Sequence, residues 1–162
     1  MSTATIVQIY CVKEATGTDI GALAAPLEAA LSQLPPELTG SVDPQVAVSS
    51  VIGLVEILDQ VRSDPDDLYV TTSTAGGLGG AVWPSDGSVN PMQQGQSVFP
   101  NISIEIPAFG QNISLWDYDS VSADDLLASI SVFEKDQGNG VISKLGRSQI
   151  EGSVYYVTYQ VD

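Results

Sequence analysis

The sequence contains no histidine, one cysteine and only five lysine or arginine residues in 162 positions. Without histidine, the chain lacks the commonest general base, the usual zinc or copper ligand and every histidine-based catalytic triad. The single cysteine, Cys11, excludes an internal disulfide, and its apolar neighbours favour a buried, inert thiol. Because phosphate neutralisation requires Lys and Arg, we expect no nucleic-acid partner.

Long hydrophobic runs are also missing. No stretch reaches the length of a transmembrane helix, and the N-terminus has neither the basic nor the apolar region of a signal peptide, so a cytoplasmic location is the default expectation. Twenty acidic residues give a net charge of −15. That charge would be repelled by an anionic membrane unless bound cations reversed the local sign.

What the sequence does contain is a series of short β-rich segments between turns. Residues 18–34 are the exception, because their leucines have helical spacing; Pro26 is expected to kink this helix or divide it in two. Residues 46–58 are dense in Val and Ile and are expected to form a long strand. Further strands are expected over residues 4–13, 68–72, 102–106, 113–117, 126–133 and 152–161. Together these elements predict one domain over residues 1–162, an all-β antiparallel sandwich of roughly eight strands with a helical insertion at 18–34.

Two acidic segments, at 59–67 and 117–125, each lie between expected strands. If the sandwich brings both to one end, many carboxylates meet there and repel one another by roughly 1 kcal/mol per close pair in water. Loops that offer only oxygen ligands suit a hard cation, and calcium first. The alternative is that Asp and Ser merely cap turns and form Asx turns without a metal. The aspartates concerned are Asp59, Asp64, Asp66, Asp67, Asp117, Asp119, Asp124 and Asp125.

The second segment resembles a known family. Trp116-Asp117-Tyr118-Asp119, followed by Ser122 and then Asp125-Leu126-Leu127, is similar to the third calcium loop of the C-two domains (protein kinase C conserved region two). The resemblance implies that Asp117, Asp119 and Asp125 are metal carboxylates and that Ser122 is a weaker oxygen ligand. It also implies an eight-stranded sandwich of two four-stranded sheets and, often, calcium-dependent phospholipid binding.

The likeness extends more weakly to the first acidic segment. Asp67-Leu68-Tyr69-Val70 is similar to the family's first-loop Asp-Pro-Tyr-Val, which implies that Asp67 bridges metal ions. The family's other first-loop Asp falls at Val61, so Asp59 or Asp64 would have to substitute for it. The resemblance covers residues 113–130 and 46–73. The predicted calcium ligands are therefore Asp59, Asp64, Asp67, Asp117, Asp119, Ser122 and Asp125.

Three classes of function follow from these patterns. The favoured one is a calcium-binding interaction module that engages a phospholipid membrane, a glycan or a protein through its acidic loop end. The second is a calcium-independent structural or assembly module, for instance one that pairs through an edge strand. The strand with Tyr155, Tyr156 and Tyr159 and the pair Trp83-Pro84 are its candidate interface, although core packing explains these aromatic residues at least as well. The third is a glycosidase with Asp117 and Asp125 as acid and base. Because histidine is absent and the aspartates have another use, we expect that the protein is not an enzyme.

Overall fold

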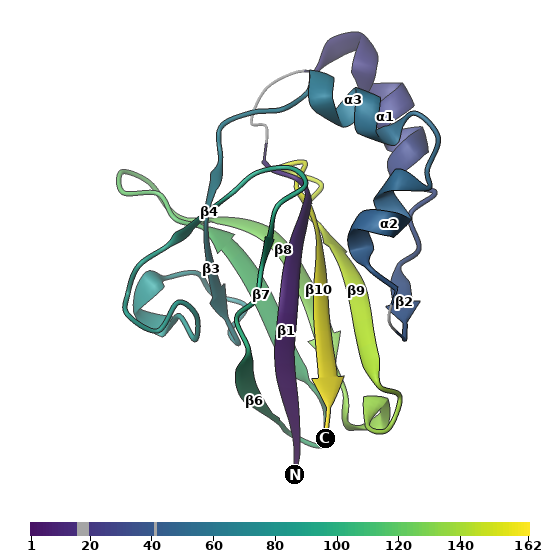
Figure 1. The fold of residues 1–162 in the computed structure, drawn as a ribbon. Helices are drawn as coiled ribbons and strands as arrows, with labels where there is room; N and C mark the ends of the chain where they lie inside the picture. The colour runs from purple at the N-terminus through teal and green to yellow at the C-terminus, as the bar shows by residue number, and fades with distance from the viewer. Residues whose placement is uncertain (16–19, 41) are drawn as a thin grey trace.

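The protein folds as two antiparallel β-sheets packed face to face, with helices covering the outer face of one sheet (Figure 1). The structure is a computed structural model and describes residues 1–15, 20–40 and 42–162. The predicted all-β sandwich with a few helices is confirmed. No helix in the described residues combines the length and the apolar character needed to span a membrane.

Sheet A is the larger sheet, and its strand order places β1 and β10 at the centre. It runs β2 (Glu37–Thr39), β9 (Val141–Arg147), β10 (Val154–Val161), β1 (Ser2–Lys13), and both β5 (Ser97–Val98) and β6 (Ile102–Ile106) pair with the far edge of β1. Sheet B runs β4 (Asn90–Met92), β3 (Asp66–Thr71), β7 (Gln111–Asp117) and β8 (Asp125–Val132). The described chain thus has ten strands, more than the eight that the family resemblance implies.

The strand β10 is buried on both faces. Tyr155, Val157 and Tyr159 belong to the core between the sheets, while Val154 and Tyr156 belong to a second core beneath the helices. A strand buried on both faces has a nearly continuous apolar sequence, which explains why this segment is recognisable. Because β10 lies between β9 and β1, it is not an edge strand. The tyrosines of this strand therefore pack in the two cores, which was the alternative to an interface role.

The prediction of a strand over residues 46–58 is also wrong. This segment forms α2 (Pro44–Ser49) and α3 (Leu54–Gln60), and the side chains of Val48, Val51, Leu54 and Leu58 are buried against sheet A. Their spacing of three and four residues is helical, so the period of the buried positions overrides the β-propensity of Val and Ile. Gly53, with φ of 80°, separates the two helices.

The predicted helical insertion at 18–34 is present as η1 (Gly21–Leu23) and α1 (Ala24–Leu31). Residues 18 and 19 lie outside the described residues. Pro26 is in the first turn of α1, where a missing N–H breaks no helical hydrogen bond, so it does not kink the helix. Leu27 and Leu31 pack in the second core. The remaining short helices are η2 (Leu78–Gly80) and η3 (Glu134–Asp136).

Candidate functional site

Three neighbouring strands of sheet B bring predicted calcium ligands to one end of the sandwich. In the pairing register, Asp117 at the end of β7 lies opposite both Leu68 of β3 and Asp125 of β8. The backbone N–H of Asp67 donates a 2.6 Å hydrogen bond to Oδ1 of Asp117. Asp67, Asp117 and Asp125 therefore lie close together although they come from two segments fifty residues apart. We call this end of sheet B, with the 118–124 loop, the acidic end.

The electrostatics of the acidic end show that its charge is not fully compensated. Burial raises the pKa of Asp117, and the carboxylates of Asp67, Asp125 and Asp119 raise it further, although the N–H of Asp67 acts in the opposite direction. Within the described residues, no donor hydrogen-bonds the carboxylate of Asp67 or of Asp125. These two side chains are therefore available to a cation.

Asp119 and Ser122 have a different position. Oδ1 of Asp119 accepts hydrogen bonds from the N–H groups of Val121 (2.8 Å) and Ser122 (3.3 Å), and the hydroxyl of Ser122 donates to Oδ2 at 2.6 Å. These donors lower the pKa of Asp119. Asp124 closes the same loop, because it accepts from the N–H of Asp119 at 3.0 Å and from the hydroxyl of Tyr69. The loop is thus shaped by the Asx-type turns that were the alternative to a metal site.

Asp59 is not brought to the strand ends of sheet B, and no described hydrogen bond or ion pair joins Asp64 to the other predicted ligands. Asp59 lies on α3, which packs against the outer face of sheet A, and its carboxylate accepts from Nε2 of Gln94 at 3.1 Å and pairs with Arg62 at 3.6 Å. Asp64 is exposed in the segment between α3 and β3. Of the seven predicted ligands, the structure thus unites Asp67, Asp117 and Asp125, ties Asp119 to Ser122 beside them, separates Asp59, and gives Asp64 no described contact with the others.

As the side chains stand, no group of three or more Cys, Asp or Glu residues in the described ranges is arranged to hold a metal ion. The donor chemistry at the acidic end suits calcium, because all the available groups are oxygens. The carboxylate oxygens of Asp67, Asp117 and Asp125 are not directed at one common position. Coordination by Asp67, Asp117 and Asp125 would therefore require side-chain rotations, which for Asp67 and Asp125 break no described hydrogen bond.

The carboxylate of Asp66, near this end, is buried and serves the fold. Asp66 accepts two bonds from the N–H of Ala15 (3.0 and 3.2 Å) and one from the hydroxyl of Tyr155 (2.6 Å). Burial raises the pKa of Asp66 to about 7. Asp66 is one of the eight aspartates of the two acidic segments, but alternate residues of a strand point to opposite faces, so Asp66 faces the core while Asp67 does not.

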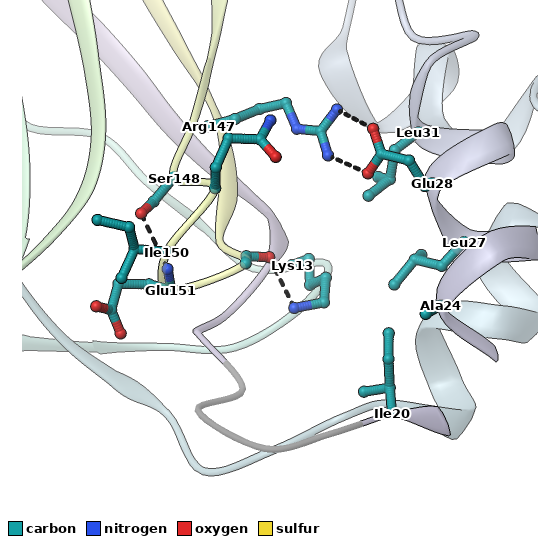
Figure 2. A pocket seen from close by; sticks show the side chains of 12 residues that line it. Lys13, Ile20, Ala24, Leu27, Glu28, Leu31, Arg147, Ser148, Ile150 and Glu151 are labelled. Atoms are coloured by element: carbon teal, nitrogen blue, oxygen red, sulfur yellow. Dashed lines mark hydrogen bonds and ion pairs between the residues drawn. The ribbon is translucent and has the colours of Figure 1, made fainter. Parts of the chain in front are cut away.

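A cavity of about 710 Å³ lies elsewhere, between α1 and the turn that joins β9 to β10 (Figure 2). Lys13 and Arg147, two of the chain's five basic residues, line it. Neither residue is among the sites predicted from the sequence. One feature of the sequence could have indicated Lys13. A lysine at the end of the apolar β1 segment is unusual in a chain with so few basic residues.

Comparisons with known proteins add no relative to this picture. No protein-family model matches the chain, and no curated protein matches it.

Proposed function

We propose that the protein is a calcium-binding β-sandwich module that engages a partner through its acidic end. One observation carries the proposal: the ends of β3, β7 and β8 unite Asp67, Asp117 and Asp125, and the pKa of Asp117 is raised by its burial and by its negative neighbours. A bound cation would reduce the repulsion between carboxylates that strand pairing holds close together. The proposal assigns no catalytic role to these residues.

Calcium suits this end for reasons of ligand number and geometry. It takes six to eight oxygen ligands at roughly 2.3–2.6 Å and tolerates irregular arrangements of carboxylates, backbone carbonyls and water. Asp67, Asp117 and Asp125 would supply the charged ligands, and carbonyls of the 118–124 loop and water would complete the shell. Asp119 and Ser122 would act by holding that loop in place.

The surroundings of the acidic end suggest how a partner would be engaged. Val121, at the tip of the loop, is 91% exposed, and Tyr118 and Leu126 are exposed beside it. Calcium would neutralise carboxylates immediately next to these apolar groups, which favours contact with an anionic phospholipid surface. A glycan or a protein with an acidic patch is the alternative partner.

The test is thermal unfolding in chelator, in calcium and in magnesium. Calcium at about 100 times its Kd would stabilise the folded protein by about 2.7 kcal/mol, a rise of roughly 5–10 °C for a chain of this size. The double variant Asp117→Asn/Asp125→Asn should lose this rise. Glu56→Gln/Glu105→Gln removes the same charge from two exposed positions away from the acidic end and should keep it.

Two results would overturn the proposal: the absence of a rise in millimolar calcium, or an equal rise in the Asp117/Asp125 variant. The first would favour the calcium-independent assembly module instead. If the rise is present, co-sedimentation with vesicles containing phosphatidylserine, with and without calcium, tests the membrane as partner. The variant Val121→Ser should then reduce vesicle binding without changing the calcium-dependent rise.

A further inference from the structure

A second cavity lies at the end of sheet B opposite to the acidic end. Its volume is about 490 Å³, within the range of roughly 300–1,000 Å³ typical of ligand pockets. The three strands that form the acidic end, β3, β7 and β8, also build this cavity. It is lined by residues that follow β3, by the first residues of β7 and by residues at the end of β8. The same strands therefore present two chemically different surfaces, one at each end.

The lining of this cavity carries no charge. None of the described residues that line it is acidic or basic, although the chain has 20 acidic residues. The cavity of Figure 2 differs, because two glutamates and two basic residues line it. Hydroxyl and amide side chains dominate here instead, and they belong to Thr72, Ser73, Thr74, Gln111, Asn112 and Ser131. Such a lining does not select an ion, and it favours a neutral ligand with many hydrogen-bonding groups.

Several of these polar groups are available to a ligand. In the described part of the chain, no hydrogen bond occupies the side-chain hydroxyl of Thr72, Thr74 or Ser131. The amide of Gln111 is fixed, because its Nε2 donates to the carbonyl oxygens of Thr72 at 3.0 Å and Asn112 at 3.2 Å. Its Oε1 has no donor among the described residues. The cavity therefore offers three hydroxyls, which can donate and accept, and one fixed acceptor.

The two phenylalanines of the cavity have different surroundings. The ring of Phe133 is confined, since a Cβ added to Gly110 would lie 2.7 Å from two of its atoms, and the ammonium groups of Lys135 and Lys144 lie 5.1 and 5.2 Å from its centroid. Phe109, in the turn before β7, is 85% exposed. The face of a phenyl ring is negative and attracts weakly positive C–H groups. An exposed ring beside free hydroxyls is therefore suited to a ligand with both C–H and O–H surfaces.

The two lysines near Phe133 do not make this cavity a site for an anion. Lys144 donates to the carbonyl oxygen of Ser131 at 2.7 Å and pairs with the carboxylate of Asp136 at 3.5 Å. Lys135 is exposed and lies outside the described lining of the cavity. An anion in the cavity would have no cation of the lining to contact, and the net charge of −15 would repel it.

We propose that this cavity binds a neutral carbohydrate, with one sugar ring stacked on Phe109 and its hydroxyls hydrogen-bonded to Gln111 and Ser131. A sugar is uncharged, its hydroxyls both donate and accept, and its ring has a C–H face. A purely apolar ligand would leave the polar groups of the lining without partners. The proposal goes beyond the calcium module and does not rest on it, because the acidic end lies at the other ends of the strands.

The test uses the full chain labelled with nitrogen-15 and four neutral disaccharides: maltose, cellobiose, lactose and sucrose. At least one of them, at concentrations up to about 50 mM, should shift the backbone amide resonances of Ser73, Gly110 and Asn112 with saturation. Glucose 1-phosphate and glucuronate should not bind, because they carry a negative charge. Sorbitol should bind at least about fivefold more weakly than the best disaccharide, because it has hydroxyls but no ring to stack on Phe109.

Two variants localise the binding. Phe109→Ala removes a side chain that is 85% exposed, so the protein should still fold, and the disaccharide should bind about fivefold or more weakly. Thr74→Val/Ser131→Ala removes two hydroxyls at exposed positions and should weaken binding about threefold or more. The control Phe99→Ala removes a phenyl ring that is 62% exposed and lies outside the described lining of the cavity. It should leave binding unchanged.

The proposal is overturned if none of the four disaccharides shifts a resonance at the cavity, or if Phe109→Ala binds them like the unmodified protein. It is also overturned if glucose 1-phosphate binds as well as the best disaccharide, because the lining would then not select a neutral ligand. Sedimentation velocity tests the other occupant: a dimer that is lost in Phe109→Ala would assign the cavity to a second copy of the chain. The calcium response is measured at the acidic end, so failure of one proposal is distinguishable from failure of the other.

Discussion

The backbone N–H of Asp67 and the carboxylate of Asp117 form a 2.6 Å hydrogen bond, while the carboxylates of the same two residues repel each other. The hydrogen bond fixes the start of β3 against the end of β7. The repulsion between the two carboxylates opposes this hydrogen bond and destabilises the contact between β3 and β7. We therefore expect that Asp67 and Asp117 lower the stability of the metal-free protein and that they are retained for binding.

Replacing Asp117 by Asn should therefore stabilise the metal-free protein. The Asn side-chain oxygen still accepts from the N–H of Asp67, whereas the like-charge repulsion, about 1 kcal/mol per close pair in water, disappears. We expect the free energy of unfolding in chelator at pH 7 to rise by up to about 1 kcal/mol at low salt, measured by urea denaturation.

The matched variant is Asp117→Leu, which removes the charge and also the acceptor. It should be less stable than Asp117→Asn, because the N–H of Asp67 then loses its partner. Salt at about 1 M should shrink the gain in Asp117→Asn, since exposed charges are screened at that concentration. A variant Asp117→Asn that is less stable than the unmodified protein in chelator contradicts the argument.

The proximity of Asp117 and Asp125 was predictable because it depends on a local pattern. Alternating strands on either side of a short acidic loop form a hairpin, so Asp117 and Asp125 must lie close together. The approach of Asp67 depends on the pairing of β3 with β7, which no local pattern in the sequence specifies. Asp66 and Asp67 are neighbours on one strand, so one carboxylate must face the core and the other must face outward. Only the structure shows that Asp66 is the residue that faces the core.

What the sequence could not supply was the packing of residues 44–60. Their Val and Ile content favours a strand, but the buried positions Val48, Val51, Leu54 and Leu58 recur with helical spacing. The deciding factor is the outer face of sheet A, with Tyr10 and Tyr156, which needs a cover. Propensity is a weak prior when tertiary burial favours the other period. This error also placed Asp59 in a loop rather than on α3.

Asp66 predicts a stability that depends on pH. Burial raises its pKa from about 4 when unfolded to about 7 in the folded protein, an effect that the hydrogen bonds from Tyr155 and Ala15 only partly oppose and that nearby Asp117 and Glu14 increase. The folded state therefore holds this proton more tightly than the unfolded state. The contribution of Asp66 to stability is fully present below about pH 4 and is lost as the pH rises through about 7.

Denaturant unfolding between pH 4.5 and pH 7.5 measures this contribution. The variant Asp66→Asn does not titrate, so its stability relative to the unmodified protein should improve with pH, by at most about 1.4 kcal/mol per pH unit. Taking the difference between the two proteins removes the general repulsion of the acidic surface, which both share. A difference that stays constant over this range would show that Asp66 is ionised throughout.

Glu14 predicts a loss of stability that is local to two loops. It is 1% exposed, and its two carboxylate oxygens accept from the N–H groups of Ser63 at 2.6 Å and Gln94 at 2.8 Å. In Glu14→Gln one of these N–H groups faces an amide NH₂ and loses its acceptor, which destabilises by about 1–3 kcal/mol.

Chemical denaturation measures the total effect, and hydrogen exchange locates it. The amides of Ser63 and Gln94 should exchange faster in Glu14→Gln than in the unmodified protein, by more than the loss of global stability explains. Glu105→Gln is the control, because Glu105 is exposed on β6, and surface changes of this kind stay within about ±0.5 kcal/mol. Equal stability of Glu14→Gln and Glu105→Gln would contradict a structural role for the Glu14 carboxylate.

Gly146 predicts how closely the two sheets approach at the edge of the sandwich. A Cβ added at this position of β9 would lie 2.8 Å from Cβ of Ala128 and 3.3 Å from the backbone N of Ser129, both on β8. Backbone atoms of a sheet cannot move aside cheaply, so Gly146→Ala should destabilise by about 1–3 kcal/mol through overpacking. Gly79→Ala, where a Cβ meets no atom within 4 Å, should be close to neutral in the same denaturation assay.

A double-mutant cycle separates this steric effect from a conformational one. The φ of Gly146 is not in the left-handed region, so alanine is compatible with its backbone, and the loss should come from the contact with Ala128. Removing the Ala128 methyl in Gly146→Ala/Ala128→Gly should recover part of the stability beyond the sum of the single effects, with a coupling of about 0.5 kcal/mol or more. If the changes in stability of the two single variants simply add in the double variant, the new methyl group does not contact the Ala128 methyl. The contact between β8 and β9 would then not set the spacing of the two sheets.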